Sequence, residues 1–121
     1  MVNVDEFKSK IENQLTQEYK IGFLGKNFNE VVNLLTESRA EKIYNWINKV
    51  FQKQIQPITI GSKKSYKEWI MHELMIFRYP FNIKGVEYRI LFVKVKNSFF
   101  IEFHLGDHKY YDKVRKELFL S

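Results

Sequence analysis

The stretch Ser98-Phe99-Phe100-Ile101-Glu102-Phe103-His104-Leu105 places an apolar side chain at every second position. Successive side chains of a β-strand point to opposite faces of the sheet, so this alternation predicts a strand. One face would carry Phe99, Ile101, Phe103 and Leu105, and the other would carry Phe100, Glu102 and His104. We therefore expect a sheet with one face on the hydrophobic core and one face at least partly open.

Two earlier stretches share this strand character, residues 69–79 and 86–96, which are rich in Ile, Val, Phe and Tyr. Turn-like residues follow them at 82–85 and at 97–98. The three strands and the turns between them predict one small sheet. The polar residues 58–67 are expected to form an exposed connection that precedes most of it.

Helical periodicity occupies the first half of the chain. Residues 4–18 carry a narrow apolar stripe, which would pack as an addition to the main body or dock onto a partner. A β-prone run at 19–24 precedes two further helical patterns, at 28–35 and from about 38 to 53. Ser38 and Glu41 have the spacing of a capping box at the start of the second, and the pair predicts an antiparallel helical hairpin.

A closing helix is expected at residues 110–120, after Gly106-Asp107 break the last strand. The order of elements is then α-β-α-α-β-β-β-α, which is typical of a small α+β domain. With 121 residues and 14.7 kDa the chain fits one domain, residues 1–121. Hydrophobic residues make up 45% of it, which is enough for a core.

The composition excludes several classes of site. Cysteine is absent, which excludes disulfide frameworks, thiolate nucleophiles and cysteine-bound metals. No apolar run approaches the roughly 20 residues that a membrane span needs. The start of the chain lacks the pattern of a secretory signal. We therefore expect a cytoplasmic protein with no membrane contact.

The net charge of +6 is concentrated in the second half of the chain. Residues 1–61 hold 8 Lys and Arg against 7 Asp and Glu, whereas residues 62–121 hold 12 against 7. A basic surface favours polyanions, either nucleic acid or an acidic protein partner. The simpler interpretation is a lysine-rich surface that only keeps the protein in solution. Aromatic residues, at 17%, provide core volume and base-stacking surface.

Four segments of the chain together have a familiar order. They are the run 19–24 with the helices to residue 53, His72-Glu73-Leu74-Met75-Ile76, Tyr88-Arg89-Ile90-Leu91-Phe92, and Gly106-Asp107-His108-Lys109-Tyr110-Tyr111. They resemble segments of the RelE/ParE toxin superfamily: its first strand and helical hairpin, its two paired central strands, and a basic, tyrosine-containing stretch after its last core strand. The likeness covers roughly residues 19–121, and Met75 stands where many members have arginine.

The resemblance implies a RelE-like fold, which is a small antiparallel sheet with a helical hairpin, here with an additional N-terminal helix and a C-terminal helix. It also implies the toxin of a toxin–antitoxin pair. Many such toxins are endoribonucleases that cleave messenger RNA on the ribosome, whereas the ParE branch inhibits DNA gyrase without being a nuclease. The expected partners are a cognate antitoxin, in a toxin–antitoxin hetero-oligomer, and the ribosome with its mRNA. A catalytically inert RNA-binding module of the same fold is a third possibility.

RNA cleavage without a metal needs a base for the ribose 2′-hydroxyl, cations for the charged phosphorane and an acid for the leaving 5′-oxygen. The three histidines are not spaced as a helical metal-binding pair, and no HExxH motif occurs. We therefore expect no cofactor and a metal-independent reaction. The candidate catalytic residues are Arg89, Lys109, Tyr111, His108 and His104.

Each candidate also has a structural interpretation. Arg89 ends an apolar stripe, where it would contact phosphate or form an ion pair with Glu73 or Glu102. Lys109 lies at a helix start, which favours anions, and a lysine beside a tyrosine lowers the phenol pKa. Alternatively Lys109 is a solvated charge and Tyr111 a packing residue. Histidine titrates near neutral pH, so His104 and His108 suit acid or base roles, or are structural.

A second group of residues is expected to bind RNA. Lysines in the connection would add salt-sensitive RNA affinity, although such a run is usually only a solvated loop. Arg78 would form a salt bridge or contact the substrate. The group is Lys63, Lys64, Lys67, Arg78, Lys84 and Tyr110.

Overall fold

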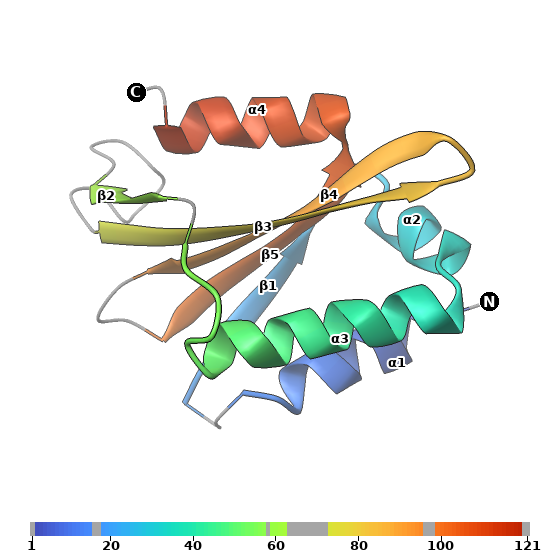
Figure 1. Ribbon diagram of the computed structural model, residues 1–121, viewed down its shortest axis with the longest axis horizontal. Coiled ribbons are helices and arrows are strands. Elements are labelled where there is room, and N and C mark those ends of the chain that lie inside the picture. The colour runs from blue at the N-terminus through green and yellow to red at the C-terminus, as the bar shows by residue number, and fades with distance from the viewer. Residues whose placement is uncertain (1, 16–17, 58, 63–72, 96–98, 120–121) are drawn as a thin grey trace.

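The computed structural model describes residues 2–15, 18–57, 59–62, 73–95 and 99–119, and it confirms the α+β class. The helices are α1 (Val4–Glu12), α2 (Phe28–Leu34), α3 (Glu37–Phe51) and α4 (His108–Phe119). The strands are β1 (Lys20–Leu24), β2 (Thr59–Ser62), β3 (Glu73–Ile83), β4 (Val86–Val95) and β5 (Phe100–Asp107). One sheet separates α4 from the other three helices (Figure 1).

The sheet is mixed, with the strand order β1-β5-β4-β3-β2. The strands β2 to β5 pair antiparallel, whereas β1 pairs parallel with β5, so the expectation of an antiparallel sheet is wrong at this edge. Short turns impose the antiparallel direction, and no short turn joins β1 to β5. The connection expected at 58–67 also contains a strand, β2, which pairs with the first residues of β3. A four-residue strand is too short to produce a clear alternation in sequence.

The hairpin between β3 and β4 turns at Lys84 and Gly85, inside the expected turn. Both residues have positive φ, 49° and 83°, as a two-residue turn compatible with strand twist requires. At the same end of the sheet, Gly106-Asp107 do not break the strand as expected. They continue β5, and α4 begins directly at His108 because the Asp107 carboxylate accepts a hydrogen bond from the Tyr110 backbone N–H at 2.9 Å.

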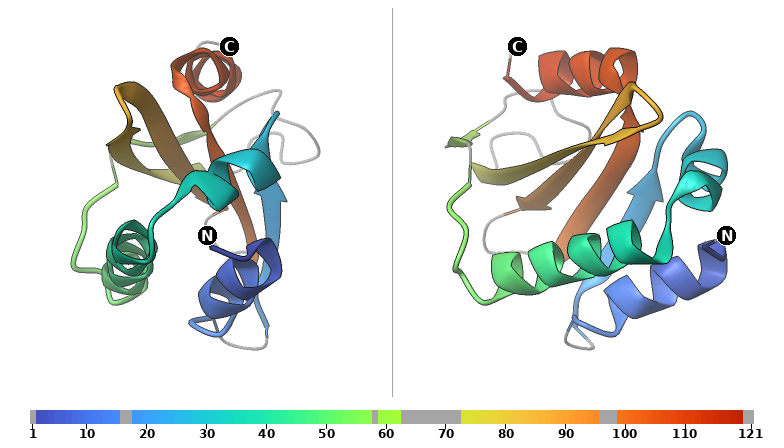
Figure 2. Two further views of the ribbon diagram at one scale, coloured as in Figure 1. Left: turned by 90° about the vertical axis from the view of Figure 1, so that its right-hand side faces the viewer. Right: turned by 45° about the vertical axis from the view of Figure 1, so that its right-hand side comes forward.

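The helix α1 is part of the core and not an addition to it. Phe7 and Ile11 are fully buried, and α1 contacts both α2 and α3. The expected antiparallel hairpin of α2 and α3 is not formed: one view of Figure 2 shows α3 end-on and α2 from the side. The connecting residues Leu35 and Thr36 are extended, with ψ of 143° and 160°, and so direct the two helices apart.

The cap of α3 is Thr36 and not Ser38. The Thr36 hydroxyl accepts a hydrogen bond from the Arg39 backbone N–H at 3.0 Å. We expect Thr36→Ala to lower the free energy of unfolding by about 1 kcal/mol, since it removes the partner of an N–H at the helix start. The matched substitution Ser38→Ala should change it by less than about 0.5 kcal/mol. Urea unfolding of both variants measures the difference, and a larger loss in Ser38→Ala would restore the original capping assignment.

Each face of the sheet has its own apolar cluster. The face toward α1, α2 and α3 carries Phe92 and Phe103, together with most of the core. The opposite face packs against α4, which contributes Tyr111, Val114 and Leu118. The face expected to be at least partly open is therefore covered where α4 lies. Polar side chains of that face are buried beside the first turn of α4.

Candidate functional site

Three polar side chains form a hydrogen-bonded series between β5 and α4, which we call the buried polar chain: Glu102, His104 and Tyr110. Glu102 and His104 are two residues apart on β5, so they share a face of the sheet, and only 6% and 4% of their surfaces are exposed. Tyr110 approaches from the first turn of α4. His104 Nε2 lies 2.8 Å from Glu102 Oε1, and His104 Nδ1 lies 2.7 Å from the Tyr110 hydroxyl.

The acceptor character of a carboxylate sets the direction of these hydrogen bonds. An ionised Glu102 can only accept, so Nε2 of His104 carries the hydrogen and donates it. In a neutral imidazole the other nitrogen, Nδ1, is then an acceptor, and the Tyr110 hydroxyl donates to it. The buried polar chain thus has the order of a catalytic triad, in which a carboxylate orients a histidine that accepts a proton from a hydroxyl.

Tyr110 is held in its protonated form. Burial raises the pKa of Tyr110 to about 12, and the negative charges of Glu102 and Glu117 act in the same direction. The expectation that Lys109 lowers the phenol pKa is therefore wrong for the adjacent Tyr110. The physical reason is that the Lys109 side chain is exposed to solvent, whereas the phenol faces a buried acid.

The tyrosine pKa values predict an alkaline transition. Burial also raises the pKa of Tyr44 to about 12, so Tyr44 and Tyr110 both favour the neutral phenol in the folded state. Each neutral phenol contributes to the free energy of unfolding, and this contribution is complete below pH 10, the pKa of tyrosine in the unfolded chain. It is lost as the pH rises from 10 to 12, by up to about 1.4 kcal/mol per pH unit for each tyrosine. Absorbance titration should find these two phenols ionising near pH 12, and ionisation of every tyrosine near pH 10 in the folded protein would contradict this.

A glycine makes room for Tyr110 on the sheet. A Cβ atom at Gly106 would lie 2.6 Å from Cδ2 of the Tyr110 ring, closer than side chains approach one another. The ring therefore lies directly over the backbone of β5, which brings its hydroxyl to His104. Any larger residue at 106 would displace the ring, so Gly106 is a positioning residue of the buried polar chain.

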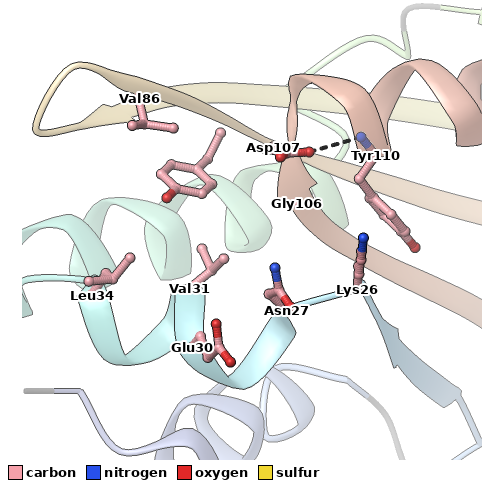
Figure 3. A pocket seen from close by; sticks show the side chains of 10 residues that line it. Lys26, Asn27, Glu30, Val31, Leu34, Val86, Gly106, Asp107 and Tyr110 are labelled. Carbon is pink, nitrogen blue, oxygen red and sulfur yellow. Dashed lines mark hydrogen bonds between the residues drawn. The ribbon is translucent and has the colours of Figure 1, made fainter.

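Tyr110 also lines a cavity of about 140 Å³ at this end of the sheet, which we call the terminal cleft (Figure 3). Its lining residues come from the start of α2, from β4 and from the junction of β5 and α4. They are Lys26, Asn27, Glu30, Val31, Leu34, Val86, Tyr88, Gly106, Asp107 and Tyr110. The side-chain nitrogens of Lys26 and Asn27 point toward Gly106 and Asp107, across the opening (Figure 3).

Arg89 lies on the same face of the sheet as the buried polar chain but has structural partners. Its guanidinium donates to Glu87 at 3.0 and 2.8 Å and lies 4.5 Å above the ring of Tyr111. The hydrogen bonds to Glu87 raise the pKa of Arg89. The ion-pair partner that the structure shows for Arg89 is thus Glu87, on the same strand. Tyr111 is 5% exposed, and its hydroxyl accepts a long hydrogen bond from Arg78 at 3.5 Å.

The remaining candidates are not gathered around the buried polar chain. His108 is exposed on α4, where Nε2 lies 3.4 Å from Asp112 Oδ2. Lys109 and Lys84 are exposed, in the first turn of α4 and in the β3–β4 turn. The candidates Lys63, Lys64 and Lys67 lie outside the described residues.

The sequence pattern placed Glu102 beside His104 but gave Glu102 no catalytic role. Of the two adjacent tyrosines, each a possible base beside Lys109, Tyr111 was expected to be catalytic and Tyr110 to bind RNA. The alternating pattern at residues 98–105 predicted that Glu102 and His104 share one face of the strand. Nothing in the sequence indicated that Tyr110 would reach His104, or that Lys26, Asn27 and Glu30 would line a cleft with it.

Two further findings concern the described residues alone. No group of three or more His, Asp or Glu side chains converges as metal ligands among them. None of the helices in the same part of the chain is long and apolar enough to cross a membrane. Comparison of the chain with protein-family models, with curated proteins and with solved structures finds no match.

Proposed function

We propose that the protein is a metal-independent endoribonuclease whose buried polar chain moves the proton in RNA cleavage. The observation that carries the proposal is the series Glu102–His104–Tyr110, which ends at a tyrosine on the wall of the terminal cleft. Buried series of this kind are common at catalytic sites, because they pair a fixed hydroxyl with a base that can take its proton.

The proposed reaction begins at the ribose 2′-hydroxyl. The phenol oxygen of Tyr110 takes the 2′-proton while its own proton passes to Nδ1 of His104, and Glu102 stabilises the imidazolium. The 2′-oxygen then bonds to phosphorus and the bond from phosphorus to the 5′-oxygen breaks, which gives a 2′,3′-cyclic phosphate. The departing 5′-oxygen takes a proton from water, and the proton on His104 returns through Tyr110 to solvent. Lys26 supplies positive charge to the phosphorane.

The order of elements supports a toxin of the RelE/ParE type. The strand β1, two helices, the paired β3 and β4, and the closing β5 and α4 follow one another along the chain in the order that the resemblance implies, with α2 and α3 at an angle in place of a hairpin. We propose the RelE-like fold on this basis, with an antitoxin, the ribosome and mRNA as partners in the cytoplasm. Met75 packs on the helical side of the sheet, away from the buried polar chain, so the missing arginine removes no cation from it.

A purified translation reaction tests this function. The protein is added, and the ends of the message are mapped by primer extension. We expect cuts within translated codons that end in 2′,3′-cyclic phosphate and disappear with Tyr110→Phe. Intact message and normal protein synthesis at every protein concentration would overturn the proposal.

The ParE-like alternative is favoured by one observation. Arg89, an expected phosphate ligand, is already neutralised by Glu87 and packed on Tyr111, which suits a protein that binds without reacting. Such a toxin would inhibit DNA gyrase and would retain this effect in Tyr110→Phe. A supercoiling assay with both proteins separates the two functions.

A further inference from the structure

The terminal cleft has the size of one aromatic ring. Its volume of about 140 Å³ is close to that of engineered protein cavities of roughly 150 Å³ that bind benzene. A single six-membered ring therefore fits, whereas a longer stretch of nucleic acid does not. The lining side chains of Val31 and Leu34, on α2, face Val86, at the start of β4 (Figure 3).

The walls of the cleft suit a flat apolar surface. Tyr88 and Tyr110 provide aromatic rings, and Val31 provides a buried aliphatic wall. At the rim, Leu34 and Val86 are each 48% exposed, which is unusual for large hydrophobic residues in the described part of this chain. Exposed apolar side chains gathered around one cavity indicate a surface that a ligand covers.

The polar groups of the cleft are available to a ligand. Asn27 precedes α2, yet its side chain makes no capping hydrogen bond. Glu30 is exposed and has no ion-pair partner within 4.0 Å among the residues that the structure describes. Asp107 uses Oδ1 to cap α4. The cleft thus presents the Asn27 amide, which donates and accepts, the Glu30 carboxylate, which only accepts, and the Lys26 ammonium, which only donates.

We propose that the terminal cleft binds the base of a cytidine nucleotide, with Glu30 accepting a hydrogen bond from the exocyclic amino group. Cytosine is a single ring that offers this N4 amino donor, and carboxylates read it by accepting from it. Uracil would turn a carbonyl oxygen toward Glu30, which repels it. Asn27 donates to the carbonyl oxygen or ring nitrogen on the same edge. This inference rests on the proposed function for the place of the base beside the cleaved phosphate, although base binding itself needs no cleavage.

Binding of mononucleotides tests the inference directly. Cytidine 3′-monophosphate, uridine 3′-monophosphate and adenosine 3′-monophosphate are titrated into the ¹⁵N-labelled full chain. We expect the cytidine nucleotide to bind at least tenfold more tightly than the other two and to shift the amide signals of Asn27, Glu30 and Tyr110. Equal affinities, or shifts confined to other residues, would overturn the assignment.

A matched pair of variants tests whether Glu30 is the residue that distinguishes cytidine from uridine. Glu30→Gln replaces the acceptor by an amide and should abolish the preference for cytidine over uridine, whereas Glu12→Gln, on exposed α1 surface outside the cleft, should retain it. An unchanged preference in Glu30→Gln would overturn the role of that carboxylate. Cytidine preference without RNA cleavage rejects the nuclease and keeps the base site. Cleavage with no cytidine preference in binding rejects the base site and keeps the nuclease.

Discussion

Replacing Phe7 by alanine is expected to lower the free energy of unfolding by about 3–5 kcal/mol, the range for a large aromatic residue removed from a core. Phe7 has no exposed surface, and its ring centroid lies 5.7–6.3 Å from those of Phe28, Tyr44 and Phe103. These partners belong to α2, α3 and β5, so the truncation leaves a cavity where the three elements meet α1.

The control for this substitution is Phe99→Ala. Phe99 is 52% exposed and has one described ring partner close by, Tyr19 at 5.5 Å. Its loss should cost less than about 1.5 kcal/mol, the scale of one aromatic pair. Chemical denaturation of both variants measures the difference. Equal losses would show that burial of Phe7 between α1 and these elements adds nothing to stability.

The second large effect concerns catalysis. Tyr110→Phe should lower the rate of RNA cleavage about 10²–10⁴-fold, the usual contribution of a positioned acid or base. The ring over Gly106 is preserved, so KM and the far-ultraviolet circular dichroism should change little. Single-turnover cleavage of a short RNA on the programmed ribosome measures the rate.

The variant Tyr111→Phe tests which of the two adjacent tyrosines is catalytic, Tyr110 as the structure indicates or Tyr111 as the sequence predicts. Tyr111 is the catalytic tyrosine that the sequence predicts, but it is buried against Arg89, and its hydroxyl accepts a hydrogen bond from Arg78 at 3.5 Å. We expect this variant to cleave within about threefold of the wild-type rate, a difference of less than 1 kcal/mol in the barrier. A severe loss in Tyr111→Phe together with full activity in Tyr110→Phe would reverse the assignment.

The strands that carry the site could be predicted because alternation is a local signal. The pattern at residues 98–105 placed Glu102 and His104 on one face, opposite Phe103, and β5 has that arrangement. Arg89 and Leu91 also share one face of β4, as the sequence predicts. In each case the spacing within one strand was sufficient, since every second residue shares a face.

Features that depend on contacts between distant elements could not be predicted. The strands β1 and β5 pair although they lie far apart in the sequence. No turn connects them directly, so the sequence does not indicate that they run parallel. The contact between Tyr110 and His104 depends on how α4 lies across the sheet, which Gly106 permits. Periodicity identified the helix but not which of two adjacent tyrosines faces the histidine.

The most direct test of the buried polar chain is the state of the His104 ring, measured by long-range ¹H–¹⁵N NMR at pH 7. We predict the tautomer protonated at Nε2, with Nδ1 showing the shift of a hydrogen-bond acceptor. In Tyr110→Phe the Nδ1 signal should move while Nε2 remains protonated. A ring protonated at Nδ1 alone, or signals that Tyr110→Phe leaves unchanged, would contradict the proton pathway on which the proposed function rests.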